Sequence, residues 1–228
     1  MEQSLKDKVK QSINYLKQAS RENQNVTFAN SLGCEDMVLT DLILRNKLNI
    51  DIFSLDTGRL HQETLAVLAK VEEKYQYKIK VYYPNTQQIE DFVNQEGVNS
   101  FYNSIELRKK CCSIRKIEPL KRALNGYDAW VTGLRREQSA NRSTMLAIEQ
   151  DAANNMQKFN PLIEWTTTDV WDYIKSFSVP YNELHDKHFP SIGCAPCTRA
   201  IAAGEDERAG RWWWETSAQE CGLHQTKI

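Results

Sequence analysis

Cysteine is the residue type in this chain whose spacing points most directly to chemistry. The six cysteines are Cys34, the adjacent Cys111 and Cys112, the C-x-x-C pair Cys194 and Cys197, and Cys221 near the end of the sequence. Charges occur throughout the N-terminal stretch, where a secretory signal would need an apolar run, so we expect a cytoplasmic location. Thiols stay reduced there, which disfavours structural disulfides and favours metal binding or catalysis.

Four of these cysteines form two pairs that together supply a complete set of metal ligands. The C-x-x-C pair alone fits either a thioredoxin-like redox motif or half of a zinc site. With Cys111 and Cys112 added, four thiolates are present, the number that both tetrahedral zinc and an iron–sulfur cluster require. Adjacent cysteines chelate one ion poorly because successive side chains diverge, whereas a cube with a metal at each of four corners accepts neighbours more easily. Zinc remains the alternative at this point.

The adjacent pair lies in a basic stretch, RKKCCSIRK. The cations that would balance four thiolates are Arg108, Lys109, Lys110, Arg115 and Lys116. The alternative is a solvated helix face, which is the usual setting for basic residues by themselves.

Cys221 is set apart from the other thiols, in the terminal sequence ECGLH. His224 follows it, and Arg208 and Arg211 precede it. A thiol reacts as its anion, and nearby cations favour that form, so this arrangement fits a reactive thiolate. The alternative is an incidental cysteine near the end of the chain. Cys34 is given no catalytic role.

Strand and helix patterns alternate over the first two thirds of the chain. Strands are predicted at 26–30, 50–58, 78–83 and 129–134, and helices at 36–47, 60–75 and 105–124. This alternation predicts an α/β fold, doubly wound, with a mainly parallel sheet. Loops at the carboxyl ends of such strands share one edge, so residues 31–33, 56–58 and 133–142 are expected to face one crevice.

A different pattern begins after Trp165. Thr167 or Thr168 is expected to cap a helix that continues to residue 177, and Pro180 prevents its extension. No sustained period follows Gly204, so we divide the chain into a main domain, 1–203, and a C-terminal tail, 204–228, that contains Cys221. The tryptophans at 212–214 are interpreted as aromatic anchors for that tail.

Composition limits the partners of this chain. It has 228 residues, with 29 Lys and Arg against 30 Asp and Glu, for a formal charge of -1. No bulk charge therefore recruits nucleic acid or an anionic membrane, and any anion site must be local. No apolar run is long enough to span a membrane. The composition leaves a homo-oligomer open.

Several motifs together resemble one known family, the assimilatory adenylyl-sulfate reductases within the adenylyl-sulfate and phosphoadenylyl-sulfate reductase group. The resemblance covers about residues 26 to 224. It depends on the motifs SLGCEDM, LDTGRLHQET, CCSIRKIEPL, TGLRREQSANR, FNPLIEWTTTDVWDYI, VPYNELHDKHFPSIGCAPCTR, ERAGRWWWE and ECGLH. It implies an adenine-nucleotide α-hydrolase-like fold with a modified phosphate loop at residues 31–36.

The resemblance also implies roles for individual residues. In the phosphate loop, Ser31 and Gly33 would contact the nucleotide through close backbone approach. Cys221 would be the nucleophile, with His224 beside it. The implied ligands of one 4Fe-4S cluster are Cys111, Cys112, Cys194 and Cys197. The implied phosphosulfate-binding cations are Lys116, Arg142, Arg208 and Arg211.

The activity implied by the resemblance is reduction of adenosine 5'-phosphosulfate to sulfite and AMP, through a cysteine S-sulfonate that thioredoxin releases. Phosphoadenylyl-sulfate reduction is the nearest alternative, and the four cysteines favour the unphosphorylated substrate. A more distant alternative is an ATP-using adenylating or thiolating enzyme, but SLGCED lacks the second glycine and final serine of its phosphate loop. A third is a zinc-stabilised nucleotide-binding regulator. Cys34 departs from the small nonthiol residue common in the family.

Overall fold

The computed structural model describes residues 2–139 and 142–215. The chain divides into two compact units, which are described separately below. The first unit consists of Met1–Ser54, Ala66–Lys80 and Gly126–Asn182. The second unit consists of Leu55–Leu65, Val81–Asn125 and Glu183–Ile228. The predicted boundary between residues 203 and 204 stays a prediction.

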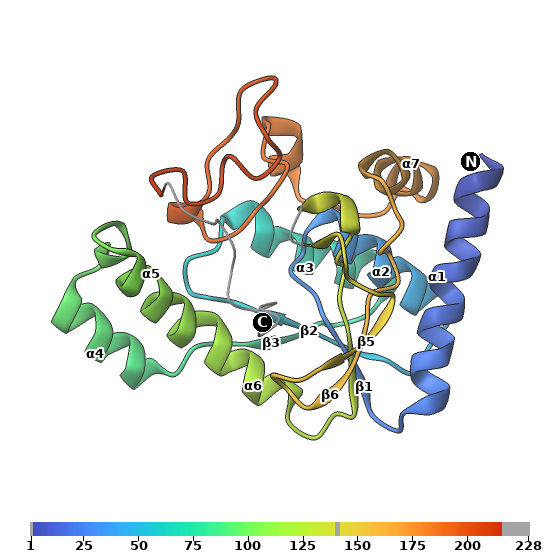
Figure 1. Cartoon of the computed structure of the whole chain (residues 1–228), viewed down its shortest axis with the longest axis horizontal. Coiled ribbons are helices and arrows are strands. Elements are labelled where there is room, and N and C mark those ends of the chain that lie inside the picture. The colour runs from blue at the N-terminus through green and yellow to red at the C-terminus, as the bar shows by residue number, and fades with distance from the viewer. Residues whose placement is uncertain (1, 140–141, 216–228) are drawn as a thin grey trace. The chain divides into compact units, whose positions relative to one another are not determined.

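A six-stranded, mainly parallel sheet is the centre of the fold, in the order β3-β2-β1-β4-β6-β5 (Figure 1). The strands are β1 (Val26–Ala29), β2 (Asp51–Leu55), β3 (Lys80–Tyr82), β4 (Ala129–Val131), β5 (Ile148–Asp151) and β6 (Met156–Phe159). β1 pairs in parallel with β2 and β4, and β4 pairs in parallel with β6. The predicted doubly wound α/β class is confirmed.

The antiparallel pairing of β5 with β6 was not expected from the sequence. Both strands have four residues, and β5 is IEQD, which is too short and too polar to show a strand pattern. Their turn contains Asn155 with φ of 52°, a left-handed conformation that asparagine tolerates.

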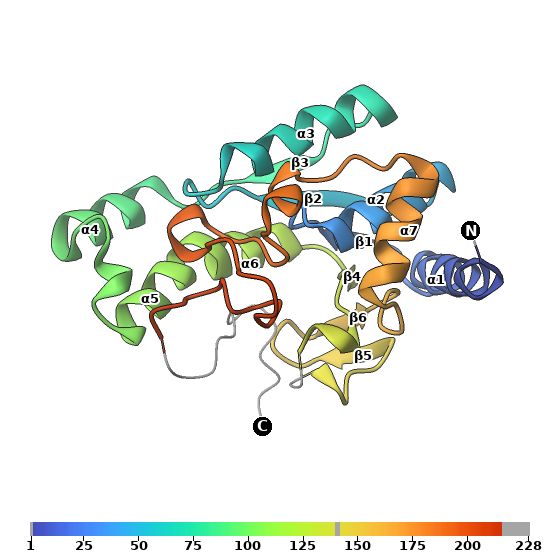
Figure 2. The same cartoon turned by 90° about the horizontal axis from the view of Figure 1, so that it is seen from above.

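Four helices pack with the strands and form the apolar core of the first unit. They are α1 (Gln3–Glu22), α2 (Cys34–Arg45), α3 (Gln62–Tyr75) and α7 (Thr167–Phe177). Of these, α2 is buried on most of its surface, with Met37, Leu39 and Ile43 fully enclosed. It packs against both α1 and α7, and the three helices lie close together in Figure 2. The strand ends are therefore fixed by a continuous core.

The start of α7 corrects the predicted cap by one residue. Thr166 is the N-cap, and its hydroxyl accepts a hydrogen bond from the Asp169 backbone N–H at 3.1 Å. The Asp169 carboxylate in turn accepts from the Thr166 backbone N–H at 2.7 Å. A reciprocal capping box of this kind requires an acceptor three residues after the cap, which only Thr166 has.

Helices and short turns make up the second unit, apart from the strand residues at its boundary. The predicted helix at 105–124 is confirmed as one helical run: α5 (Ile105–Cys112), a π-helical turn (Ser113–Ile117) and α6 (Glu118–Leu124). A further helix, α4 (Thr86–Glu96), was not predicted. Short 3-10 turns occur at Ser100–Tyr102, Glu183–Lys187 and Ala195–Cys197.

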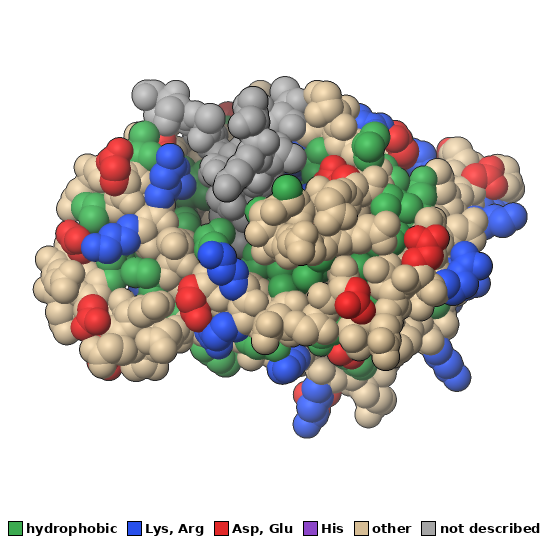
Figure 3. Space-filling model, turned by 60° about the horizontal axis from the view of Figure 1, so that its bottom comes forward, with side chains coloured by type: hydrophobic (Ala, Val, Ile, Leu, Met, Phe, Trp, Pro, Cys, Tyr) green, Lys and Arg blue, Asp and Glu red, His purple; other side chains and the backbone are tan. Residues whose placement is uncertain are grey.

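Three cysteines lie in the apolar cluster of this second unit. The cluster contains Cys111, Cys194 and Cys197 together with Phe92, Phe101 and Trp212. Acidic and basic side chains are interspersed over the face shown in Figure 3, in agreement with the near-neutral charge. Among the described residues, no helix is long and apolar enough to cross a membrane.

Candidate functional site

The loop between β1 and α2 is held by its own side chains. The Asp36 carboxylate accepts hydrogen bonds from the Ser31 backbone N–H at 2.6 Å and from the Ser31 hydroxyl at 2.5 Å. Leu32 is in the left-handed region, with φ of 64°, and its N–H donates to the Asn30 side chain at 2.6 Å. These bonds fix a tight turn directly before the N-terminus of α2, where backbone dipoles favour an anion.

A second loop meets this turn at the point where the strand order reverses. β1 and β4 are neighbours, β2 continues on one side and β6 on the other, so their carboxyl ends form a topological switch point. Gly133 follows β4, and its backbone N–H hydrogen-bonds to Asp36. A Cβ at Gly133 would lie 1.9 Å from Asp36 Oδ1, so only glycine fits here. The predicted meeting of loops 31–33 and 133–142 is supported, and loop 56–58 belongs to the second unit.

Two acidic side chains at the start of α2 have opposite titration behaviour. Burial raises the pKa of Asp36 to about 7, although its bonds from Ser31 and Gly133 favour the anion. Burial also opposes ionisation of Glu35, but the Arg135 guanidinium lowers its pKa below the ordinary value. Arg135 Nε donates to Glu35 Oε1 at 3.0 Å. The negative charge of Glu35 is therefore neutralised by Arg135, whereas burial favours the protonated, uncharged form of Asp36.

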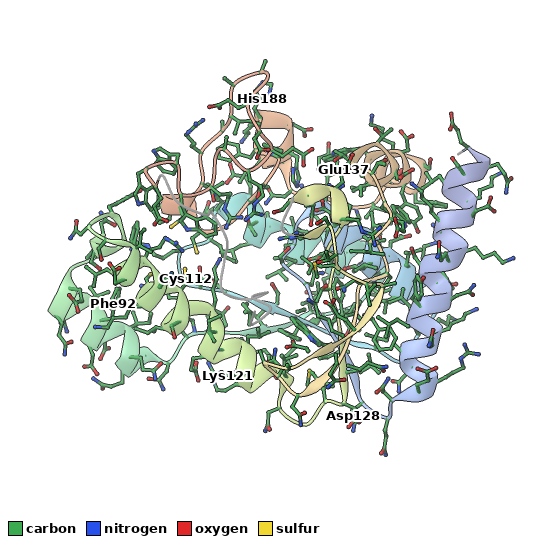
Figure 4. The ribbon with its side chains drawn as sticks, in the orientation of Figure 1. Phe92, Cys112, Lys121, Asp128, Glu137 and His188 are labelled. Carbon is green, nitrogen blue, oxygen red and sulfur yellow. The ribbon has the colours of Figure 1, made fainter. Side chains whose placement is uncertain are left out.

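Arg142, one of the predicted substrate-binding cations, is connected to this loop through Gln138. Gln138 Nε2 donates to Glu35 Oε1 at 2.8 Å, and its Oε1 accepts from the Arg142 guanidinium. Glu137, labelled in Figure 4, accepts from the Thr167 N–H at 2.8 Å and ties the same segment to the start of α7. The predicted residues Ser31, Gly33 and Arg142 are thus brought together by polar side chains that sequence reasoning did not single out.

The four predicted metal ligands lie in the second unit, on two segments. Cys111 and Cys112 end α5, and Cys194 and Cys197 flank the 3-10 turn Ala195–Cys197. Cys112 is labelled in Figure 4, with sulfur atoms drawn in yellow nearby. Cys111, Cys194 and Cys197 share one buried cluster, and Cys112 hydrogen-bonds to Arg108.

Polar donors are directed at these sulfur atoms. The Thr57 hydroxyl lies 3.2 Å from Cys194 Sγ, and Arg115 hydrogen-bonds to Cys111 and donates to the Thr57 carbonyl at 2.7 Å. The π-helical turn after Cys112 inserts an extra residue and so rotates the following side chains, which places Arg115 inside. Its Nε has no hydrogen-bond partner among the described residues.

The cysteine thiols are strongly affected by burial and by one another. Burial raises the pKa of Cys197 to about 12, and Cys194 and Cys111 raise it further, while Lys116 and Arg211 oppose the shift. Burial likewise raises the pKa of Cys111, against the effect of Arg115. A bound metal would reverse this, because a coordinating thiol is deprotonated.

Only part of the basic stretch around Cys111 faces the thiols. Arg108 and Arg115 are buried, whereas Lys109 and Lys110 are exposed, and Lys110 pairs with Glu96 at 2.8 Å. The solvated-face interpretation therefore holds for the two lysines and fails for the two arginines.

Arg211 and the tryptophans after it pack near the thiols. Arg211 is buried over the Trp212 ring and donates to the Ile192 carbonyl at 3.3 Å. A Cβ at Gly193 would lie 2.4 Å from the Arg211 guanidinium, so the glycine makes room for it. Trp212 is buried with the cysteines and Trp214 packs on Tyr102, which supports the aromatic-anchor interpretation, while Trp213 is 40% exposed.

Four cysteines are a donor set that either a tetrahedral zinc ion or an iron–sulfur cluster could use. Within residues 2–139 and 142–215, no three His, Cys, Asp or Glu side chains converge on one point as ligands of one metal ion would. Arg115 beside Cys111, and Lys116 and Arg211 near Cys197, would balance the charge of metal-bound thiolates.

Arg208 is the last of the predicted phosphosulfate-binding cations. Arg208 lies in the turn before Arg211, where its carbonyl accepts from the Arg211 N–H at 2.8 Å. Cys221 and His224 lie outside the described residues.

The switch-point loops, the parallel sheet and its helices define the class as an α/β protein of the adenine-nucleotide α-hydrolase-like type. The family model described as the phosphoadenosine phosphosulfate reductase domain matches residues 25–200. The chain therefore belongs to the adenylyl-sulfate and phosphoadenylyl-sulfate reductase family.

Relatives of known name are similar over nearly the whole chain. An adenosine 5'-phosphosulfate reductase of Burkholderia cepacia is 52% identical, over 98% of this chain and 90% of its own. One from Allochromatium vinosum is 53% identical, over 95% of this chain and 85% of its own.

The fold is similar to solved structures as well. A phosphoadenylyl-sulfate reductase from Candida auris, in a phosphate complex, has a TM-score of 0.72 and 26% identity, covering 88% of this chain and 98% of that one. An FMN adenylyltransferase of Candida glabrata has a TM-score of 0.61 at 14% identity, covering 92% and 73%, and shares the fold alone.

Proposed function

We propose that this chain reduces adenosine 5'-phosphosulfate to sulfite and AMP. The observation that carries the proposal is the combination of a built phosphate loop at the switch point with a second unit in which Cys111, Cys194 and Cys197 share one buried cluster near Lys116 and Arg211. Relatives about half identical over most of the chain, named adenosine 5'-phosphosulfate reductases, support the same substrate.

The nucleotide would bind at the loop formed by Ser31 to Asp36. The Asp36 bonds to Ser31 and Gly133 hold the loop shape before substrate arrives, which lowers the ordering cost of binding. Lys116, Arg142, Arg208 and Arg211 are proposed to neutralise the phosphosulfate oxygens, and the planar arginines suit bidentate contact with them.

Cys221 is the proposed nucleophile, with His224 beside it. Its thiolate attacks the sulfate sulfur, the bond from that sulfur to the phosphate oxygen breaks, and AMP leaves with the bonding pair. A cysteine S-sulfonate remains. A thioredoxin thiolate then attacks the Cys221 sulfur and releases sulfite, and the second thioredoxin thiol resolves the mixed disulfide, so a dithiol supplies both electrons.

Cys111, Cys112, Cys194 and Cys197 are proposed to hold one 4Fe-4S cluster. When bound, the cluster supplies a fixed local charge that complements the surrounding cations. Around it, Thr57 and Arg115 orient Cys194 and Cys111 through the hydrogen bonds described above, and Trp212 excludes water. The cytoplasmic location expected from the charged N-terminal stretch belongs to the same proposal.

The decisive experiment replaces the nucleophile and follows the adduct by intact mass. Wild-type protein, prepared without oxygen and offered adenosine 5'-phosphosulfate, is expected to gain one SO₃ group, and Cys221→Ser is expected to gain none and to form no sulfite. Iron content and AMP binding should be unchanged, because Cys221 is not a ligand. Sulfite formation by Cys221→Ser would contradict the proposal, and an adduct formed only with the 3'-phosphorylated nucleotide would favour the phosphoadenylyl-sulfate alternative.

A further inference from the structure

A buried ion pair joins Arg108 of helix α5 to Glu215. Arg108 Nε donates to Glu215 Oε1 at 2.5 Å, and Arg108 Nη2 donates to Glu215 Oε2 at 2.9 Å. The two side chains are 3% and 4% exposed. The guanidinium also lies 4.8 Å from the centre of the Trp212 ring.

Stability alone does not account for this pair. Desolvation of two charges offsets most of their attraction, so apolar side chains of the same size would serve folding equally well. A bidentate arginine–carboxylate pair does something that apolar packing does not: it fixes both the position and the orientation of its partner. The geometry therefore indicates a positioning role.

The position that it fixes is a junction between two functional segments. Arg108 hydrogen-bonds to Cys112, one of the proposed cluster ligands. Glu215 follows Trp212, whose backbone N–H donates to the Cys197 carbonyl at 3.2 Å, and the Glu215 N–H donates to the Trp212 carbonyl at 2.9 Å. The proposed nucleophile, Cys221, comes six residues after Glu215 in the sequence.

We infer that Arg108 and Glu215 form a positioning clamp that sets the point from which the segment with Cys221 departs. This inference rests on the function proposed above. Six residues span at most about 20 Å, so the place of Glu215 limits the volume that the thiol can reach. Releasing the clamp enlarges that volume and lowers the fraction of time for which Cys221 is aligned with substrate.

The same helix offers a matched control. Lys110 pairs with Glu96 at 2.8 Å, but their side chains are 47% and 30% exposed. An exposed pair contributes little and does not fix its partners. Glu96→Gln therefore removes an ion pair from α5 without releasing the clamp.

The test compares Glu215→Gln, Arg108→Lys and Glu96→Gln as intact, iron-loaded protein. Glu215→Gln and Arg108→Lys are each expected to form the Cys221 sulfonate about tenfold or more slowly in a single turnover. AMP affinity should stay within about twofold. Iron per chain is measured for each variant and the rates are corrected for it, because Arg108 also contacts the proposed ligand Cys112. Hydrogen exchange of residues 209–215 should accelerate in both variants. Glu96→Gln should match wild type in all four measurements.

Further measurements distinguish a failure of the clamp from a failure of the proposed function. The double variant Arg108→Lys with Glu215→Gln should be no slower than the slower single variant, because both release one clamp. Adduct formation at the wild-type rate in Arg108→Lys, despite faster exchange, would overturn the clamp. If one single variant loses iron, the other decides by the same criterion. No adduct in wild type would instead refute the proposed function.

Discussion

The two units of this chain are stabilised in different ways. The first unit has a parallel sheet and a continuous apolar core, in which Leu16, Phe28 and Met37 are fully enclosed. The second has helices and 3-10 turns around a small cluster in which three of six buried members are cysteines. Polar contacts to those cysteines and the buried Arg108–Glu215 ion pair also hold this second unit together.

The difference shows where a cofactor matters for structure. An apolar core is sufficient to hold the nucleotide loop, because burial of large side chains stabilises the sheet directly. Buried thiols and buried arginines contribute little until an opposite charge is present. The second unit should therefore depend on the proposed cluster, and the first should not.

The strongest way to break this comparison is to remove a ligand. Cys194→Ser is expected to lose most of the iron, and hydrogen exchange of residues 105–124 and 194–215 should accelerate more than about tenfold, because metal binding is coupled to folding. Exchange of β1, β4 and α2 should stay near its wild-type rate. Lys109→Gln, an exposed change beside the cysteines, is the control. Equal acceleration in both units would contradict the comparison.

A smaller effect is expected from a steric change within the first unit. Gly133→Ala places a methyl group against the Asp36 carboxylate and should lower the free energy of unfolding of the first unit by about 3 kcal/mol. Nucleotide affinity should fall with it, while iron content stays unchanged. Asp36→Ser combined with Gly133→Ala relieves the clash and should recover part of the loss. Full stability of Gly133→Ala, measured by exchange of β1 and α2, would show that the loop does not need glycine.

The smallest effect concerns pH. The pKa of Asp36 is raised by burial to about 7, so its contribution to stability is complete below the unfolded pKa near 4, declines as pH rises, and is lost above about 7. Wild type should lose stability relative to Asp36→Asn between pH 4 and 8, measured by exchange of β1 and α2. A difference that is constant over this range would mean that Asp36 is ionised throughout. The second unit should show no such dependence on the variant.

Most of the fold could be predicted from local patterns. The strands at β1, β2 and β4 and the helix at 105–124 follow from apolar periodicity, and the α/β class follows from their alternation. The β5–β6 hairpin could not be found, because four polar-rich residues do not show a period. The cap of α7 was misplaced by one residue, since three consecutive threonines present the same chemistry and only Asp169 distinguishes them.

The residue types of the candidate site could be predicted from the sequence, but the contacts between those residues could not. Cysteine spacing alone grouped Cys111, Cys112, Cys194 and Cys197, and the structure brings their segments into one unit. Glu35, Asp36 and Gln138 were missed, although the first two stand inside the quoted loop motif. Two adjacent acidic residues beside an expected anion site could have drawn attention to them, because carboxylates in such a place must be paired with a cation or protonated.

Sequence by itself determined the order of elements, the near-neutral charge and the grouping of thiols, because periodicity, composition and spacing are local properties. Only the tertiary structure decided which charges are buried together: Glu35 with Arg135, and Arg108 with Glu215 across 107 residues. The helix or strand propensity of a charged residue is the same whether its side chain faces water or an oppositely charged partner. Its partner is selected by the packing of segments distant in sequence, and that selection exists only once the chain has folded.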